Sequence, residues 1–382
     1  MASNNLRGQT AAVGVGLSDF GDVPGFTHFE LMAQAVERAL ADAGLKKADV
    51  DGVFATLEPS NLPVVAVCEY LGIRPKVMEG TMIGGSSFVN YLQWAALALQ
   101  AGLCEVALIT YGSNSRSGKR KPGGAVPIPY EGAYDARLVT AYALATARHM
   151  HQYGTTRAQL AEVPVAARAW ARLNPKATQR GPLSIEDVIR SRMVSDPLTV
   201  ADCCLISDGA GAVIMTRADR AKYLPRKPAY LLGVAAETSH LGIAQMADLT
   251  VTAAAQSGPR AFSMAGLAPK DVDVLSLYDA FSINTLLFLE DLGFCSKGEG
   301  GAFVSGGNIA PGGKLPVNTN GGGLSCMHPG MYGVFTIIET VTQLRGDAGE
   351  RQVKDPKVGL AHGNGGSLST QVTSLFGTEE TL

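Results

Sequence analysis

Apolar runs alternate with amphipathic segments along this chain, and the alternation occurs twice. Residues 43–53 read AGLKKADVDGV and residues 265–275 read AGLAPKDVDVL, an offset of 222 positions without a gap. In each copy an amphipathic helix, predicted at 29–45 and at 251–267, ends in Gly-Leu, a common helix stop. The pattern therefore predicts two copies of one folding unit.

The remaining segments correspond as well, and each half reads β-α-β-α-β-α-β-β. The matching pairs are opening strands 11–16 and 229–234, strands 50–57 and 272–277, apolar helices 87–103 and 330–345, strands 105–111 and 357–361, and closing strands 211–215 and 370–375. Apolar strands that alternate with helices predict an α/β protein with a mainly parallel sheet in each half, covered on both faces. The two long helices are apolar nearly all round, which predicts that they are buried between the sheets of a five-layered α-β-α-β-α sandwich.

The expected division of the chain is an N-terminal half, 1–216, a polar linker, 217–228, and a C-terminal half, 229–382. About 90 residues, 112–205, are inserted into the first half. The insertion begins with a basic stretch, SNSRSGKRKPGG, and continues with helical patterns. We interpret it as a loop domain, or lid, over a site.

Composition narrows the class of protein. Charged residues make up 17% of the 382, against about 25% in an average soluble domain, so large buried layers or a subunit interface are expected. A net charge of −2 without a block of like charges argues against nucleic-acid binding. We expect no secretory signal and no membrane-spanning helix. The six cysteines form no CxxC pair and no metal-ligand cluster is visible, which favours buried thiols in the cytoplasm.

Four loops concentrate glycine and polar atoms. They are 84–87 (GGSS), 278–281 (YDAF), 321–330 (GGGLSCMHPG) and 362–366 (HGNGG). In open α/β sheets such loops bind ligands at the carboxyl ends of the strands. The first and third loops each open one of the long helices, whose free N–H groups and dipole suit an oxyanion such as a thioester enolate.

The order of these loops over more than 280 residues, together with the run NTNGGGLSCMHPGMYG, resembles the thiolase superfamily over the whole chain. The resemblance is to the branch of sterol-carrier-protein-type thiolases and steroid side-chain aldolases once called lipid-transfer proteins. It implies the thiolase fold, a coenzyme A thioester as substrate and no covalently bound cofactor. It also implies a homodimer or dimer of dimers that pairs through the N-terminal sheet, and a small zinc-ribbon/OB-fold protein as a partner.

Thiolases carry a nucleophilic cysteine at the start of the first central helix. That position falls here on Gly85 or Ser86, and residues 69–103 contain no cysteine, so the usual acyl-enzyme is not expected. Ser86 remains a candidate nucleophile. Alternatively, Ser86 and Ser87 only cap the helix, and this loop then offers backbone donors.

Three further residues match catalytic positions of the family. In the aldolase branch a tyrosine that serves in acid/base work opens the second motif, and Tyr278 stands there; a core tyrosine is the alternative. Asp279 is expected to cap the next helix. His328 matches the box whose histidine binds the thioester oxygen, although the aldolase branch has a second tyrosine near this position. His362 falls where thiolases carry an acid/base cysteine, with a turn histidine as the alternative.

Other residues receive supporting roles. Gly365 and Gly366 would bring the backbone close to the ligand, and Cys326 is expected to be a buried thiol. Basic residues of the inserted loop would meet the phosphates of coenzyme A, unless the stretch is only solvated. These residues are Arg116, Lys119, Arg120 and Lys121.

The hypothesis that follows is a thiolase-like enzyme that makes or breaks a carbon–carbon bond next to a thioester. Retro-aldol cleavage of a 3-hydroxyacyl-CoA is favoured, because it needs a base and donors for the enolate oxygen but no cysteine. The alternatives are acyl transfer of the thiolase kind, through Ser86 or directly between thioesters, and a CoA-binding scaffold subunit without chemistry.

Overall fold

A computed structural model describes residues 6–57, 61–119, 131–134 and 138–382. The first half contains β1 (Thr10–Leu17), α1 (His28–Ala43), β2 (Gly52–Ala55), α2 (Pro63–Leu71), β3 (Val77–Glu79), α3 (Ser87–Gln100), β4 (Ala107–Asn114) and β7 (Asp208–Arg217). The second half contains β8 (Ala229–Thr238), α8 (Ala254–Ala265), β9 (Val274–Leu277), α9 (Ser282–Asp291), α10 (Gly300–Val304), α11 (Gly333–Arg345), β10 (Val358–Gly365) and β11 (Thr370–Gly377). The first half follows the predicted order of strands and helices, whereas the second has two helices and no named strand between β9 and α11.

The two half-sheets are joined into one nine-stranded sheet, in the order β3-β2-β4-β7-β1-β8-β11-β10-β9. The junction lies where Ala11 and Ala12 of β1 pair with Tyr230 and Ala229 of β8. The third strand of the second half is reduced to a single parallel bridge between Leu275 of β9 and Val317. With that bridge counted, the strand order is the same in both halves.

The prediction of a mainly parallel sheet is wrong. Only β2–β3, β2–β4 and β9–β10 are parallel, and the other five pairs are antiparallel. The physical reason is that β10 turns directly into β11 and β4 pairs with β7 without a covering crossover helix, and parallel neighbours need such a crossover. Each half is therefore parallel at its outer edge and antiparallel towards the junction.

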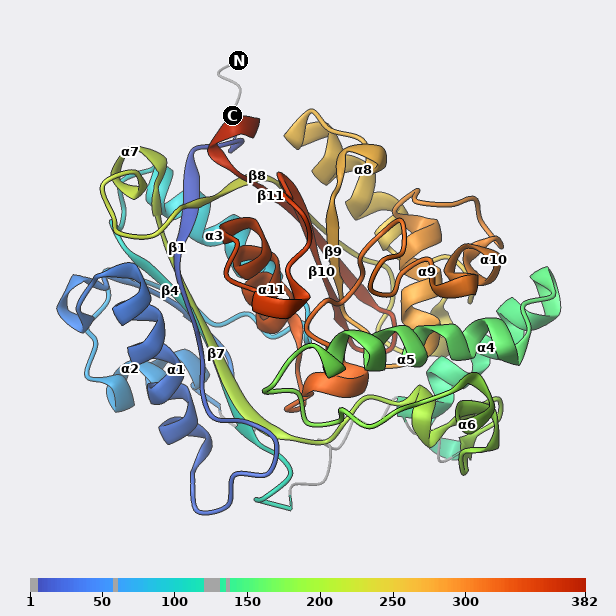
Figure 1. Ribbon diagram of the computed structural model, residues 1–382. Coiled ribbons are helices and arrows are strands. Elements are labelled where there is room, and N and C mark those ends of the chain that lie inside the picture. Colours follow the sequence, from blue (N-terminus) through green and yellow to red (C-terminus); the bar gives the residue numbers. More distant parts are fainter. Residues whose placement is uncertain (1–5, 58–60, 120–130, 135–137) are drawn as a thin grey trace.

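The predicted five layers are confirmed (Figure 1). The helix α3 packs on β4 and β7 of the first half and on β8 and β10 of the second, and α11 likewise contacts strands of both halves. The helices α1 and α2 cover the outer face of the first half, and α8 covers that of the second. Nearly all side chains of α11 are buried, in agreement with its apolar pattern.

The insertion carries α4 (Leu138–Tyr153), α5 (Arg157–Arg172), α6 (Ile185–Arg190), β5 (Met193–Ser195) and β6 (Leu198–Thr199), and α7 (Ala218–Ala221) follows β7. The helix α4 packs on α9, whereas α5 contacts α9, α10 and the tight turn Gly322–Cys326. In Figure 1 these green helices lie across the second half. In the part of the chain that the structure describes, no helix is long and apolar enough to cross a membrane.

The outer helices start and stop where local chemistry predicts. Thr27 and Glu30 form a capping box at the start of α1, which satisfies free N–H groups. Gly44 after α1 and Gly266 after α8 both adopt the left-handed conformation, with φ of 67° and 65°, and glycine takes it at the least cost. The Gly-Leu stops of the repeat are thus confirmed in both copies.

Glycines in the central strands let the outer helices approach closely. A Cβ atom on Gly14 of β1 would overlap the backbone of α1 at Ala39, and one on Gly233 of β8 would overlap the backbone of α8 at Ala261. The same contact therefore occurs at corresponding places in both halves. Helix backbone cannot move aside without shifting a whole layer, so these positions have little tolerance for a larger residue.

We therefore expect Gly233→Ala to destabilise the fold by about 1–3 kcal/mol, the usual cost of overpacking. The measurement is the thermal midpoint followed by circular dichroism. Gly181→Ala is the matched control, because a Cβ there would meet no atom within 4 Å. Equal midpoints for both variants and the parent would contradict the close packing of α8 on β8.

Candidate active site

The N-termini of the two central helices meet at glycines. Gly333, the first residue of α11, lies so close to Gly85 that a Cβ atom on it would overlap the Gly85 carbonyl. A Cβ on Gly85 would in turn overlap the ring and hydroxyl of Tyr278. The phenol of Tyr278 therefore occupies the space that a side chain at position 85 would need. It lies where both helices present their free N–H groups.

The serines beside this junction are engaged with the preceding loop. The Ser86 hydroxyl donates to the Ile83 carbonyl at 2.9 Å, and the Ser87 hydroxyl donates to the Gly84 carbonyl at 2.7 Å. Neither hydroxyl accepts a capping bond from α3, so the prediction of side-chain capping is wrong. The loop folds back on itself, and both hydroxyls face its carbonyls rather than the first N–H groups of α3.

Three aromatic rings form the centre of the site. The Tyr278 ring contacts His328 edge-on, with centroids 5.4 Å apart, and contacts Tyr332 edge-on at 5.8 Å. The His328 and Tyr332 rings are stacked at 5.8 Å. The Tyr332 hydroxyl bonds to the side-chain amide of Asn320. The second and third sequence motifs thus come together here, with a second tyrosine between them and α11.

His328 is 7% exposed, and its Nε2 has no hydrogen-bond partner among the described residues. Its backbone N–H donates to the Ser207 hydroxyl at 2.9 Å, which fixes the residue in place. Burial lowers the pKa of His328 to about 4. The imidazole is therefore neutral at pH 7, and its Nε2 is able to exchange a proton.

The Tyr278 hydroxyl is kept neutral. Burial raises its pKa well above 10, and the neighbouring Cys204, Tyr142 and Tyr111 add to the effect. The backbone N–H of Tyr332 acts in the opposite direction. Among the described residues, the groups that shift this pKa most include no lysine or arginine. Tyr278 is thus a hydrogen-bond donor at neutral pH rather than a phenolate base.

Asp279 does not cap α9, so that prediction is wrong. The N-cap of α9 is Phe281, without a side-chain bond. The Asp279 carboxylate instead accepts the backbone N–H of Gly323 at 2.6 Å and is completely buried. A residue that follows Tyr278 in the chain therefore holds the loop that carries His328.

The structure does not bring His362 to these residues. Its Nδ1 bonds to Thr373 and its Nε2 to Gln371, both at 3.0 Å and both on β11. Its ring packs on Phe288 of α9. Side chains alternate along a strand, so His362 lies on the face of β10 opposite to Gly363, which contacts Ser86.

The remaining predicted site residues are placed as follows. Gly365 lies against the backbone of Ile83, and Gly366 accepts the Tyr142 hydroxyl, so this loop does approach the start of α3. Arg116 forms an ion pair with Asp22 at 3.0 Å. Lys119 adopts a positive φ of 50° in a turn. The prediction for Arg120 and Lys121 lies outside the described residues.

Cys204 is a site residue that the sequence pattern did not indicate. Its backbone N–H donates to the Ala280 carbonyl at 2.8 Å, and its thiol is close enough to Tyr278 and Tyr142 to raise the pKa of both. Cys204 is half-buried, as are Cys203 and Cys295, which corrects the expectation that all cysteines are buried. The signal that could have indicated Cys204 is its position at the end of the insertion, just before β7.

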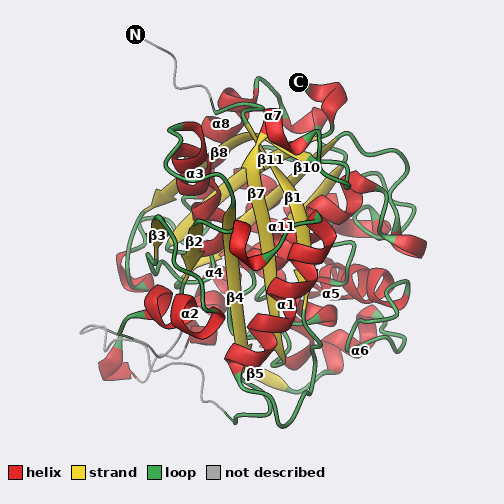
Figure 2. Ribbon diagram, turned by 90° about the vertical axis from the view of Figure 1, so that its left-hand side faces the viewer, coloured by secondary structure: helices red, strands yellow, loops and turns green. Residues whose placement is uncertain are grey.

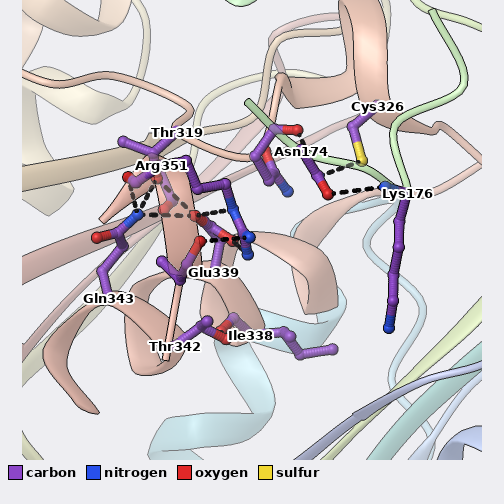
Figure 3. Close-up of polar contacts among 12 residues, drawn as sticks. Asn174, Lys176, Thr319, Cys326, Ile338, Glu339, Thr342, Gln343 and Arg351 are labelled. Atoms are coloured by element: carbon purple, nitrogen blue, oxygen red, sulfur yellow. Dashed lines mark hydrogen bonds and ion pairs between the residues drawn. The ribbon is translucent and has the colours of Figure 1, made fainter. Parts of the chain in front are cut away.

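A cavity of about 380 Å³ lies behind the His328 loop, between β1, α1, α11 and the segment 174–176. Figure 3 shows its wall, where Glu339 accepts bonds from Thr319, Gln343 and Arg351. Cys326 lies at this wall, buried as predicted, and burial raises its pKa to about 12. Tyr278 and Gly85 do not line this cavity.

Comparison with known proteins finds similarity over the whole chain. Residues 235–378 match the family model described as Thiolase C-terminal domain-like. The chain is 33% identical to the acetyl-CoA acetyltransferase of Methanothermobacter thermautotrophicus, with 96% of this chain and 98% of that protein covered. It is 34% identical to the 17-hydroxy-3-oxo-4-pregnene-20-carboxyl-CoA lyase of Mycobacterium tuberculosis, covering 94% and 95%. A solved Ltp2–ChsH2(DUF35) aldolase matches with a TM-score of 0.90 at 31% identity, covering 99% and 100%.

The buried His362 predicts acid lability. Burial lowers its pKa to about 4, below the value of about 6.5 in an unfolded chain. The folded state then binds fewer protons, so stability is lost as pH falls from 6.5 to 4, by at most about 3 kcal/mol. We expect His362→Gln to flatten the dependence of the thermal midpoint on pH in this window. His151→Gln, at an exposed position, is the control, and equal slopes in both variants would refute the linkage.

Proposed function

This chain belongs to the thiolase superfamily, in the branch of the sterol-carrier-protein-type thiolases and steroid side-chain aldolases, and we propose that it cleaves 3-hydroxyacyl-CoA thioesters by a retro-aldol reaction. The similar proteins confirm the resemblance to this superfamily that we inferred from the four loops. The substrate carries a hydroxyl on Cβ, and the products are an aldehyde or ketone and a shortened acyl-CoA.

The contact between Gly85 and Tyr278 carries this proposal. A nucleophilic side chain at position 85 would overlap the phenol, which disfavours an acyl-enzyme there. The Tyr278 hydroxyl instead stands at the N-termini of α3 and α11 with a neutral histidine beside it. A donor for an enolate oxygen together with a proton acceptor is what retro-aldol cleavage requires.

The proposed reaction starts at His328. Its neutral imidazole takes the proton of the β-hydroxyl, the Cα–Cβ bond breaks, and a carbonyl forms at Cβ. The electron pair moves into the enolate, whose oxygen accepts hydrogen bonds from the Tyr278 hydroxyl and helix N–H groups. The imidazolium then returns the proton to Cα. A pKa of about 4 makes imidazolium unfavourable in this buried site, and the enolate that forms with it offsets that cost.

Acyl transfer remains the second candidate, because a relative named acetyl-CoA acetyltransferase aligns over 96% of this chain. It would use Ser86 or direct transfer between thioesters. The Ser86 hydroxyl is fully buried and donates its proton to the Ile83 carbonyl rather than to a histidine or a carboxylate. A serine without a base is a weak nucleophile, so we favour the aldolase.

We also propose that a small zinc-ribbon/OB-fold protein assembles with this chain. The support is the similar solved aldolase, which is named as Ltp2 together with ChsH2(DUF35). A coenzyme A thioester as substrate is supported by the two relatives, one named for acetyl-CoA and the other for a carboxyl-CoA. We place the protein in the reducing cytoplasm, in accord with its six free cysteines.

A homodimer through the first half completes the proposal. Exposed apolar side chains occur on α2, on β3, on the loop that follows β3 and on α3. They include Val65, Tyr70, Met78, Met82 and Trp94. The strand β3 is the edge strand of the sheet (Figure 2). Met78 and Trp94 are 54% and 45% exposed, and an edge strand with exposed apolar residues favours pairing with a second chain.

The reaction is tested by mass spectrometry with a panel of 3-hydroxyacyl-CoAs without free coenzyme A, and with 3-ketoacyl-CoAs plus coenzyme A. Both arms are run with and without a zinc-ribbon/OB-fold protein. We expect a shortened acyl-CoA and an aldehyde or ketone in the first arm. Two acyl-CoAs formed only in the second arm would favour thiolysis instead. No product in either arm, with coenzyme A still bound, would indicate a scaffold subunit.

In the first arm, Tyr278→Phe and His328→Gln should each lower turnover at least ~100-fold, the low end of general acid–base effects. Phe keeps the ring that fills the space beside Gly85, and Gln keeps a polar side chain, so both variants are expected to fold. Ser86→Ala is the control and should stay within about threefold of the parent. A large loss in Ser86→Ala with normal turnover in the other two would reverse the assignment.

Light scattering tests the dimer. We expect a particle of twice the 39.8 kDa chain mass at micromolar concentration. The double variant Met78→Asp with Trp94→Asp should have the mass of a monomer, because charge on the paired surface opposes its burial. Tyr223→Asp, 80% exposed near α7, should leave the mass unchanged. A monomeric parent protein would disprove this part of the proposal.

A further inference from the structure

The turn that precedes His328 is unusual in its backbone. Gly322–Cys326 form a π-helical turn, entered through Gly321 and Gly322 at positive φ of 104° and 63°. The turn directs the N–H groups of Gly323 and Leu324 to the Asp279 carboxylate, at 2.6 and 3.4 Å. A helix of this type leaves N–H groups that need acceptors, and Asp279 supplies them.

The fit around this carboxylate is close. A Cβ atom on Gly322 would overlap Asp279 Oδ2, so any other residue would push the carboxylate away. Asn318 also bonds to the end of β9. Its Oδ1 accepts the backbone N–H of Leu277, next to Tyr278, at 2.7 Å. The end of β9 and the glycine turn are thus joined by buried hydrogen bonds.

We propose that Asp279 is a positioning residue whose ionised carboxylate clamps the Gly322–Cys326 turn and thereby holds His328 against Tyr278. Asp279 itself does not contact the substrate in this proposal. It joins the two motifs that carry the reacting groups, since it follows Tyr278 directly and binds the turn that ends two residues before His328. The inference deepens the proposed function, on which its kinetic readout rests.

Protonation of Asp279 would weaken the clamp. A protonated carboxyl places an O–H donor where the turn presents N–H donors, so one acceptor is lost. Burial raises the pKa of Asp279 to about 7, opposed by the N–H groups it binds. A turn that opens while Asp279 stays buried removes these N–H groups, which raises the pKa of the carboxyl further. The ionised form therefore favours the closed turn over the open one, and the clamp loosens as the pH falls below about 7.

The groups that face Asp279 do not titrate in the same range. Cys326 on the turn and Tyr332 before α11 have pKa values raised to about 12 and well above 10. Cys204 on the insertion side also has a raised pKa, and that of His328 is lowered to about 4. Opening of the turn returns the pKa of His328 towards its ordinary value of about 6.5. Between pH 6.5 and 8.5, the change on this turn is therefore assigned to Asp279.

Hydrogen–deuterium exchange of the segment 321–328 tests the clamp without any need for activity. We expect the protection factors of Gly323 and Leu324, corrected for intrinsic exchange, to rise about tenfold from pH 6.5 to pH 8.5, because bonds to an ionised acceptor are stronger. Asp279→Asn should show low protection at both pH values. Asn174→Ala is the matched control.

Asn174 donates to the Asn320 carbonyl at 2.9 Å on the cavity side of the same loop (Figure 3). Its loss should lower protection equally at both pH values and keep the tenfold ratio. Constant protection in the parent between the two pH values would overturn the proposal, and so would a pH-dependent ratio that persists in Asp279→Asn. The parent measurement decides the question even if a variant fails to fold.

The kinetic readout separates positioning from a merely structural role. In the retro-aldol assay, kcat of the parent should rise with pH through about 7, which gives the pH profile an acidic limb. Asp279→Asn should lose that limb. Its kcat should fall at least ~10-fold, with KM changed less than threefold. Asn174→Ala should keep the limb. If the parent cleaves no substrate, the proposed function fails while the exchange result still decides the clamp. A limb retained in Asp279→Asn would refute the pH-sensitive role.

Discussion

The close meeting of two helix N-termini is the constraint on which the site depends. At one point, α3 and α11 begin with their backbones in contact, and Gly333 lies directly against the Gly85 carbonyl. Gly363 of β10 fits against Ser86 at the same junction. Only residues without a side chain allow this approach. The result is a place inside the protein where the N-termini of two helices lie beside one phenol, an arrangement that suits an oxyanion.

Burial of this junction determines the protonation of the groups around it. Tyr278 remains a neutral donor, His328 a neutral imidazole with an unpartnered nitrogen, and Asp279 a carboxyl that titrates near neutrality. Each shift has the same cause, because a low-dielectric interior disfavours charge on any of them. In the proposed function, the site uses neutral groups that exchange protons together with backbone dipoles, and the Asp279 carboxylate holds the loop rather than the substrate.

Because the folding unit is duplicated, the two halves of the chain each build one side of the site. Each half contributes one central helix, and the two half-sheets are joined at β1 and β8 into a continuous sheet around both helices. The halves have diverged at their edges. In the first half, β3 is a true edge strand with Met78 exposed, whereas in the second the matching strand is a single bridge at Val317. That shortening leaves room for the chain that leads to Asn318, Asn320 and the glycine turn.

The amino-acid pattern by itself determined the architecture and the family. The repeated Gly-Leu stops, the apolar central helices and the order of the four loops are local properties of the chain, and the layers and the superfamily followed from them. The pattern also singled out Tyr278 and His328, because each stands at the end of a recognisable segment. The prediction of parallel strands near the junction was wrong, because no local signal in the sequence distinguishes a crossover connection from a direct return to the neighbouring strand.

Only the tertiary structure decided what individual side chains face. His362 and Gly363 are neighbours in sequence, yet they lie on opposite faces of β10, so the histidine joins a hydrogen-bond network with β11 and the glycine faces α3. Asp279 resembles a helix cap in sequence but binds a turn 44 residues away. Cys204 approaches Tyr278 only because the insertion returns there. Such contacts depend on distance in space, and hydrophobic periodicity carries no information about which distant loop will meet which strand end.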